Sequence, residues 1–294
     1  FSITLSHCFE VSFIALLFIN TDYKYKCFFF KSLSLQKKMM KQDSVKIMGI
    51  LNITPDSFYA ESRCVSEMEI LRTAERMLDE GADILDVGGV STRPDCDFVT
   101  EEEEIGRILF AVRSLVRHFP GVTLSVDTFR PKVAHLCCDE GCKIINDISG
   151  GCDEMYGVLA TYDVSYVLMH FIGKDGKMSM DHHYSDILNE MMEYFKDKIN
   201  RINSFGVKDI IIDPGFGFSK NIEENWYVLD NLNVFTAMNL PILVGLSRKS
   251  MIYKPLSISP QDSLEATLSA NRKAVENGAS ILRVHDVKEH KNLL

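Results

Sequence analysis

The stretch Gly49-Ile50-Leu51-Asn52-Ile53-Thr54-Pro55-Asp56-Ser57-Phe58 points to the fold of this chain. In it, an apolar run typical of a buried strand stops abruptly at a polar loop that has no use in a core. The same change recurs along the sequence, at Asp86–Gly89, Ser125–Thr128, Ile145–Asp147, Leu168–His170, Asp213–Phe218, Gly245–Ser250 and Arg283–Asp286. Strands that end in polar groups this regularly are typical of a barrel enzyme, which builds one active site from many strand ends.

A repeating unit of amphipathic helix, glycine and apolar strand begins at Lys46. It predicts strands at 46–52, 83–88, 122–127, 143–147, 164–169, 209–213, 241–246 and 280–285. The glycines, which suit the left-handed position after a helix, are Gly81, Gly141, Gly206 and Gly278. Apolar strands that alternate with helices predict a parallel sheet closed into a (β/α)8 TIM barrel. The alternative is an open, doubly wound sheet, but that fold gathers its ligand loops at one switch point.

Local signals predict where several helices begin. Ser66-x-x-Glu69 and Thr100-x-x-Glu103 have the form of capping boxes. Pro131 and Pro260 suit the first position of a helix. The acidic run Glu101–Glu104 is expected to complement the dipole of a helix N-terminus.

The sequence predicts one folded domain at residues 41–294, preceded by a non-native or disordered N-terminal extension at 1–40. Residues 1–41 carry six Lys and two acidic residues, a net charge of +4, so the remainder carries −9 − 4 = −13. The apolar run Val11–Ile19 is shorter than the roughly 20 residues that span a bilayer. Our hypothesis is that Met39 or Met40 is the true start. Nine residues follow His285, so the last barrel helix is expected to be truncated.

Composition excludes some classes of partner and site. The net charge of −9 and the pI near 5.4 argue against a nucleic-acid partner. The cysteines show neither a disulfide framework nor zinc-ligand spacing, although Cys137, Cys138 and Cys142 lie close together. Thiols kept in a reducing compartment are the simpler interpretation, so we expect a cytoplasmic protein with no membrane partner.

Two kinds of polar group follow the expected strands. One kind is acidic or amide: Asp127, Asn146 and Asp213, with Asp86 as a further candidate. The other kind is basic: Arg93, Arg248, Lys249, Arg283 and His285. So many cations in an acidic protein indicate an anionic ligand, and Arg and Lys are the usual phosphate binders. Buried carboxylates with an amide suit a ligand that carries several N–H donors and a carbonyl. The combination predicts a nitrogen heterocycle that carries a phosphate or diphosphate.

No close set of histidines and carboxylates predicts a metal centre held by protein alone. Asn52 is the candidate Mg²⁺ ligand through its side-chain oxygen, with diphosphate and water completing the coordination shell.

Residues 46–290 resemble the dihydropteroate synthase family along essentially the whole expected barrel. The matching segments are Met48–Phe58, Asp86–Gly89 with Ser91–Pro94, Ser125–Thr128, Ile145–Asp147, Asp213–Phe218, Gly245 with Ser247–Ser250, and Arg283–Val287. The resemblance implies a transferase of folate biosynthesis with a pterin-binding barrel at 41–294. Its reaction condenses 6-hydroxymethyl-7,8-dihydropterin diphosphate with 4-aminobenzoate and gives 7,8-dihydropteroate and diphosphate.

The same resemblance implies a role for each matching residue. The pterin would be held by Asp127, Asn146, Asp213 and Lys249, in a pocket that includes Gly245. The diphosphate would be bound by Asn52, Arg283 and His285, with Asn52 also facing Mg²⁺. Thr92 and Arg93 would lie on a loop that closes over the diphosphate. The aminobenzoate pocket, which sulfonamide drugs occupy in this family, would be lined by Phe218, Ser219, Ser247 and Arg248.

The chain departs from the family pattern at three places: Tyr59–Ser62 stand where Asp-Gly-Gly is frequent, Val90 replaces a frequent Glu, and Ser219 replaces a frequent Gly. Members of the family dimerise through their last helices, so a homodimer is expected if the C-terminus is complete. Two alternatives stay open. One is a pterin-binding methyltransferase with a corrinoid partner, and the other is a catalytically inactive pterin-binding homologue.

Overall fold

The computed structural model describes residues 45–53, 63–89, 99–174, 177–178 and 182–294 of the chain. The chain divides into the units Phe1–Ser44 and Val45–Leu294, and the second holds all the described residues. The expected extension at 1–40, the apolar run Val11–Ile19 and both candidate start positions lie outside them.

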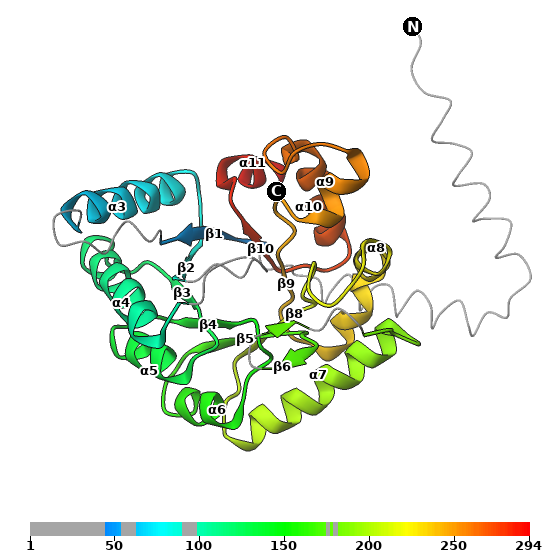
Figure 1. Ribbon diagram of the computed structural model, residues 1–294, viewed down its shortest axis with the longest axis horizontal. Helices are drawn as coiled ribbons and strands as arrows, with labels where there is room; N and C mark the ends of the chain where they lie inside the picture. Colours follow the sequence, from blue (N-terminus) through cyan, green and yellow to red (C-terminus); the bar gives the residue numbers. More distant parts are fainter. Residues whose placement is uncertain (1–44, 54–62, 90–98, 175–176, 179–181) are drawn as a thin grey trace, which may run out of the picture. The chain divides into compact units, whose positions relative to one another are not determined.

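The second unit is a barrel of eight parallel strands, surrounded by helices in Figure 1. The strands are β1 (Lys46–Asn52), β2 (Ile84–Gly88), β3 (Leu124–Asp127), β4 (Ile144–Asp147), β5 (Ser165–Met169), β8 (Ile210–Asp213), β9 (Leu243–Val244) and β10 (Ile281–Val284). Their order is β8-β5-β4-β3-β2-β1-β10-β9. A parallel bridge from Ile212 to Ile242 brings the two ends of this sheet together. The predicted TIM barrel is therefore confirmed, and the open doubly wound alternative is wrong.

Helices follow the strands around the outside of the barrel (Figure 1). They are α3 (Arg63–Asp79), α4 (Glu101–His118), α5 (Pro131–Asp139), α6 (Asp153–Leu159), α7 (Ile187–Ser204), α8 (Ile222–Asp230), α9 (Ser250–Leu256), α10 (Leu264–Glu276) and α11 (Val287–Leu293), with the 3-10 helix η2 (Leu232–Met238) after α8. A small antiparallel pair, β6 (Gly173–Lys174) and β7 (Lys177–Met178), follows β5. The last helix, α11, has seven residues, as the short segment after His285 predicts. No described helix is both long and apolar enough to cross a membrane.

The helix signals were partly right. Thr100 caps α4 in a full capping box, and Pro131 is the first residue of α5. The box at Ser66 is wrong, because α3 already runs from Arg63 and places Ser66 inside the helix. Pro260 is also wrong as a helix start, since α10 begins at Leu264 with Ser263 as its N-cap. Pro260 lies instead in a turn that Ser259 and Asp262 close through their side chains.

The strands place apolar and polar side chains at different heights in the barrel interior. One interior layer is apolar and almost fully buried: Met48, Ile84, Ile144, Val167, Ile211, Leu243 and Ile281. Side chains on a strand alternate between its two faces, so residues two positions further on face the same interior. Those residues include Asp86, Asn146, Asp213 and Arg283. The interior is therefore closed by an apolar layer, and polar groups lie directly above it toward the carboxyl ends of the strands.

Truncating this apolar layer should destabilise the whole barrel. We expect Met48→Ala to lower the free energy of unfolding by about 2–5 kcal/mol, because Met48 is fully buried and its loss leaves a cavity. The matched control is Met68→Ala on α3, whose side chain is 50% exposed and whose loss should cost at most about 0.5 kcal/mol. Denaturant unfolding measures both, and equal losses in the two variants would contradict the layered interior.

Candidate active site

Arg283 bonds to two of the polar residues above the apolar layer, and a third bonds to one of these. Its Nε donates to Oδ2 of Asp86 at 2.6 Å, and its Nη2 donates to Oδ2 of Asp127 at 2.8 Å. The amide of Asn146 donates to the same Asp86 oxygen at 3.1 Å. Strand register places Asp127 of β3 between Gly88 of β2 and Asn146 of β4. Asp86, Asp127, Asn146 and Arg283 thus form one hydrogen-bonded cluster, which we call the Arg283 cluster.

Burial strongly affects the charges of the Arg283 cluster. Burial raises the pKa of Asp127 to about 7; the charge of Arg283 opposes this rise and that of Asp86 adds to it. Burial works to lower the pKa of Arg283, but Asp86 and Asp127 outweigh it, so the pKa of the guanidinium is raised and it stays charged. Oδ1 of Asp86 and Oγ of Ser125 are buried and have no hydrogen-bond partner among the described residues. The cluster therefore holds more acceptor capacity than its own donors satisfy.

Asp213, the last residue of β8, and Lys249, the N-cap of α9, lie near Arg283. The backbone N–H of Gly215 donates to Oδ1 of Asp213 at 2.7 Å. Lys249 donates to the carbonyl of Phe216, and its Nζ lies 4.7 Å from the ring centroid of Phe218. Burial lowers the pKa of Lys249 to about 8, and the nearby carboxylate of Asp213 opposes that shift. Burial likewise raises the pKa of Asp213, against the charge of Lys249.

The segments after β9 and β10 meet at the rim of the barrel. Nδ1 of His285 lies 2.9 Å from Oγ of Ser247, and Nη2 of Arg248 donates to Asp286 at 2.7 Å. Arg248 takes a left-handed backbone conformation, with φ of 57°. Gly245 flanks Arg283, since a Cβ added at Gly245 would lie 3.8 Å from that of Arg283.

Asn52 and Ser219 complete the described candidates. Asn52 is exposed at the end of β1, and its side-chain oxygen faces Gly88, beside Cβ of Asp127. Ser219 is buried, has φ of 50°, and donates its hydroxyl to the carbonyl of Ile172 at 2.8 Å.

Comparison with known proteins identifies the family. Residues 48–285 match the family model described as pterin binding enzyme. The chain is 40% identical over 248 residues to the dihydropteroate synthase of Escherichia coli strain K12, which covers 83% of this chain and 87% of that protein. The chain belongs to the dihydropteroate synthase family of pterin-binding enzymes.

Solved structures of this family agree with the barrel. The dihydropteroate synthase of Thermus thermophilus in complex with 4-aminobenzoate is 36% identical, with a TM-score of 0.75 over 86% of this chain and 93% of that one. The Yersinia pestis dihydropteroate synthase with a sulfonamide drug complex is also 36% identical, with a TM-score of 0.78 over 86% and 93%. Dihydropteroate synthases are transferases of folate biosynthesis, and the resemblance stated from the motifs is confirmed.

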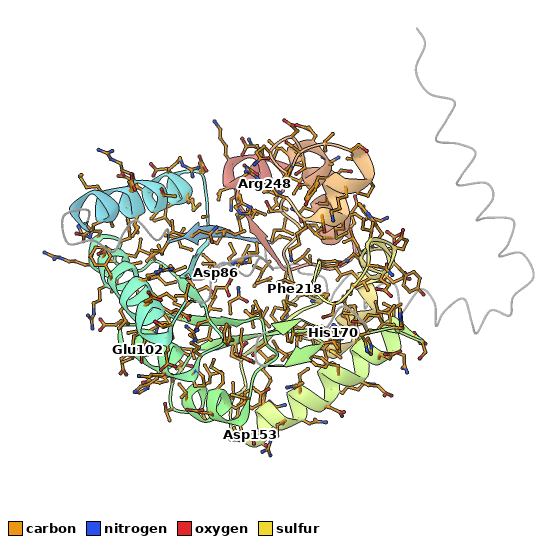
Figure 2. The ribbon with its side chains drawn as sticks, viewed as in Figure 1. Asp86, Glu102, Asp153, His170, Phe218 and Arg248 are labelled. Carbon is orange, nitrogen blue, oxygen red and sulfur yellow. The ribbon has the colours of Figure 1, made fainter. Side chains whose placement is uncertain are left out.

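The dihydropteroate synthase motifs converge where the structure describes them. Asp86, Asp127, Asn146 and Arg283 are hydrogen-bonded to one another, Asp213 and Lys249 lie close enough to shift each other's pKa, and Ser247 contacts His285. Figure 2 shows Asp86 and Phe218 toward the middle of the ring of strands, whereas Glu102 and Asp153 lie on its outer helices. Thr92, Arg93, Val90 and Tyr59–Ser62 lie outside the described residues.

Glu104 is a buried residue that the motif analysis missed. The acidic run was expected only to complement the dipole of α4, but Glu104 is 1% exposed and pairs with Arg130. It also accepts a hydrogen bond from Thr128 at 2.7 Å, directly after Asp127. Its helical spacing from Ile108 and Ala111, on the buried face of α4, is the sequence signal that marks it. The dipole interpretation still suits Glu101 and Glu102 at the start of α4.

Lys220 and His170 are a second buried pair without a prior role. Nζ of Lys220 lies 3.1 Å from Nδ1 of His170, and both side chains are buried. His170 closes a polar strand end in the sequence, and Lys220 directly follows the Gly-Phe-Gly-Phe-Ser run.

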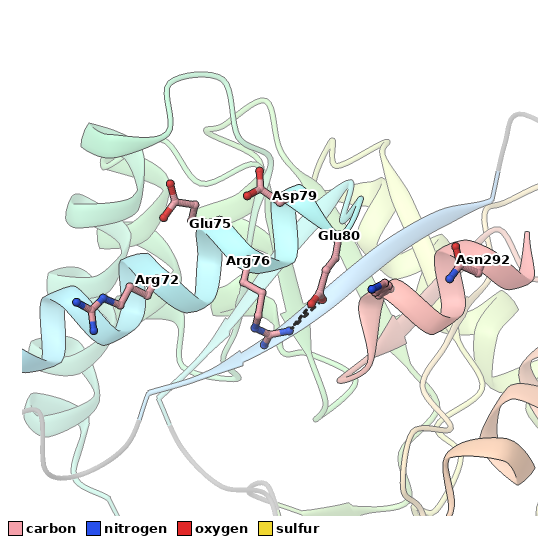
Figure 3. Close-up of a pocket in the computed structure, with 7 residues that line it drawn as sticks. Arg72, Glu75, Arg76, Asp79, Glu80 and Asn292 are labelled. Atoms are coloured by element: carbon pink, nitrogen blue, oxygen red, sulfur yellow. Dashed lines mark hydrogen bonds and ion pairs between the residues drawn. The ribbon is translucent and has the colours of Figure 1, made fainter.

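A concave surface of about 590 Å³ lies away from the strand ends, between α3 and α11 (Figure 3). Its lining is entirely polar or charged: Arg72, Glu75, Arg76, Asp79, Glu80, Lys288 and Asn292. Arg76 and Glu80 are paired with each other across one helical turn. Exposed charges that pair among themselves are typical of a solvated helix surface. The candidate site is therefore the group of strand ends, where buried charges converge.

The raised pKa of Asp127 predicts a pH-dependent stability. The ordinary pKa of an Asp is 3.8, whereas burial raises the pKa of Asp127 to about 7. Between these values the folded chain holds a proton that the unfolded chain has lost, so stability falls as pH rises through this window. Melting temperatures of the wild type and Asp127→Asn, taken from pH 4.5 to 7.5, should show the wild type losing more stability. If the difference in melting temperature between the two proteins stays constant over this pH range, the raised pKa of Asp127 is contradicted.

Proposed function

We propose that the Arg283 cluster, together with Asp213 and Lys249, carries out the dihydropteroate synthase reaction of the family. The substrates are 6-hydroxymethyl-7,8-dihydropterin diphosphate and 4-aminobenzoate, and the products are 7,8-dihydropteroate and diphosphate. The observation that carries the proposal is Arg283, a cation bonded to two carboxylates at the carboxyl ends of the strands. The relative from Thermus thermophilus, solved with 4-aminobenzoate, supports the second substrate.

The carboxylates suit the pterin ring. Asp127, Asn146 and Asp213 supply acceptors from three strands, and Oδ1 of Asp86 is a buried acceptor still to be satisfied. An aminopyrimidinone edge presents several N–H donors in one plane, which matches this set. A ligand without those donors would leave buried acceptors unpaired, at a cost of about 1–3 kcal/mol for each. We propose that Lys249, beside Asp213, contacts the same ring.

The rim suits the diphosphate and a Mg²⁺ ion. Arg283 lies on β10 and His285 directly follows that strand. Asn52 supplies a side-chain oxygen at the end of β1, the strand that pairs with β10. Among the described residues no group of three histidine, cysteine or acidic side chains forms a metal centre, so protein ligands alone would not hold the ion. One amide oxygen with diphosphate and water fits the octahedral preference of Mg²⁺. When bound, the ion would neutralise negative charge that grows on the leaving diphosphate.

The proposed chemistry needs no protein nucleophile. The bond between the pterin methylene carbon and the diphosphate oxygen breaks, and the diphosphate carries away the bonding electrons. Arg283 and His285 stabilise this negative charge, while Asp127 and Asp213 stabilise the positive charge left on the pterin. The amine of 4-aminobenzoate then forms the new C–N bond and releases a proton. We propose that Phe218, Ser219, Ser247 and Arg248 line the aminobenzoate pocket, with Gly245 leaving room beside Arg283.

Several parts of this proposal rest on the family alone. Thr92 and Arg93 lie outside the residues that the structure describes, so their place on a loop over the diphosphate stays a prediction. So do the homodimer, which light scattering of the purified protein would test, and the cytoplasmic location.

The direct test is turnover with both substrates. Purified protein should release diphosphate only when the pterin diphosphate, 4-aminobenzoate and Mg²⁺ are all present, and EDTA should abolish the release. The product should be identified as dihydropteroate by mass spectrometry. Pterin binding without turnover would instead favour an inactive homologue, and methyl transfer from a reduced folate to a corrinoid protein would favour the methyltransferase alternative.

The division between pterin and diphosphate sites has its own test. Because Arg283 is bonded to Asp127, removing either should disturb both ligands, so Asp213 and His285 make a cleaner pair. We expect Asp213→Asn to weaken binding of 6-hydroxymethylpterin and of its diphosphate about tenfold each, since it removes the charge that faces the ring. His285→Gln should weaken only the diphosphate, again about tenfold. Calorimetric titration measures both, and equal losses for both ligands in both variants would contradict the division.

A further inference from the structure

Lys220 is a buried cation that the reaction described above does not use. It is 6% exposed, directly follows Ser219, and donates from Nζ to the carbonyls of Gly215 and Phe218 at 3.2 and 3.1 Å. Its third partner is Nδ1 of His170 at 3.1 Å, on the neighbouring strand end. Three partners around one buried ammonium satisfy all of its donors, so the lysine is held in one place.

His170 is suited to accept from Lys220 because its surroundings keep it neutral. Its ring packs against Tyr184, Tyr194 and Phe195, and its side chain is 1% exposed. Burial, followed by the charge of Lys220, lowers the pKa of His170 to about 2. A neutral imidazole accepts through one nitrogen, so Nδ1 takes the hydrogen bond from Lys220 and the ring proton is on Nε2.

The turn that Lys220 holds is unusual in its backbone. Gly215, Gly217 and Ser219 all have positive φ, at 68°, 79° and 50°. A left-handed conformation is unfavourable for serine, so the turn needs contacts that enforce it. Gly215 has no room for a side chain, since an added Cβ would lie 2.4 Å from the carbonyl oxygen of His170. The turn is therefore closely fitted against the end of β5.

Polar side chains fix this turn from both sides. Lys220 binds the carbonyls of residues 215 and 218, and Lys249 binds the carbonyl of Phe216. Asn225 accepts from the N–H of Gly217 at 2.7 Å and donates to the carbonyl of Lys220 at 3.1 Å. The ring that projects from the turn is Phe218, which Lys249 covers on one side. Lys220 therefore holds the turn that carries Phe218, and none of its hydrogen bonds is to a residue of the Arg283 cluster.

We infer that Lys220 is a positioning residue for the aminobenzoate half of the site, because its bonds to His170 and to two carbonyls fix the turn that carries Phe218. This inference rests on the proposed function, in which Phe218 lines the aminobenzoate pocket. Asp213 lies within β8 and is held there by strand pairing. Lys220 is the last of the groups that lower the pKa of Asp213, after Lys249, Gly215 and Arg283, so the pterin half depends less on Lys220.

The test compares Lys220→Met with Lys208→Met, a matched change at an exposed lysine just before β8. In Lys220→Met we expect the KM for 4-aminobenzoate to rise about tenfold at saturating pterin diphosphate, with kcat changed by less than about threefold. The dissociation constant of the pterin diphosphate, from calorimetry, should change by less than about threefold. Lys208→Met should leave all three values unchanged.

His170→Leu is a second variant, and it tests the positioning role of Lys220 even if Lys220→Met does not fold. It removes one of three partners of the ammonium, so the KM for 4-aminobenzoate should rise about threefold while pterin binding is kept. A purely structural lysine would lower the melting temperature and leave both KM values at the wild-type level, which overturns the inference alone. An equal loss of pterin binding also overturns it. A wild-type protein that forms no dihydropteroate overturns the proposed function together with the inference.

Discussion

Arg283 is the group on which the arrangement of the site depends. A guanidinium buried in a barrel interior is stable only when carboxylates pair with it, and here Asp86 and Asp127 do so from two neighbouring strands. Each carboxylate in turn tolerates burial because of Arg283. The pairing ties β10 to β2 and β3 above the apolar layer. It also leaves Oδ1 of Asp86 without a partner among the described residues, which is the acceptor that the proposed pterin site uses.

The two lysines beside this cluster have different surroundings. Lys249 is near Asp213 and covers Phe218, so it lies between the proposed pterin and aminobenzoate halves of the site. Lys220 binds the carbonyls of Gly215 and Phe218 and the neutral His170, so all three of its hydrogen bonds are to the turn after β8 or to the end of β5. Burial lowers the pKa of both ammonium groups, to about 8 for Lys249 and about 7 for Lys220. Groups that are costly to bury are concentrated at this end of the barrel, as is typical of functional sites.

A layer of supporting residues stands behind the strand ends. Glu104 of α4 reaches Thr128 and Arg130, and Arg130 binds the carbonyls of Val99 and Thr100. The segment after β3, which follows Asp127, is therefore joined to the start of α4. Such partners fix the orientation of residues that contact a ligand, because a side chain held by several bonds has few other conformations available.

The sequence by itself determined the barrel, its strand positions and most members of the candidate site. Apolar runs that alternate with helices leave few other folds, and a polar residue at the end of a parallel strand lies at the common mouth of the barrel, as Asn146 and Arg283 do. Local helix-start motifs were less reliable, since no helix begins at Ser66 or at Pro260 in the structure. Only the tertiary structure decided which charges meet. Asp86 and Arg283 are 197 residues apart, and Lys220 and His170 are 50 apart. Their pairing follows from strand register and from the desolvation of buried charge, which no local pattern of residues encodes.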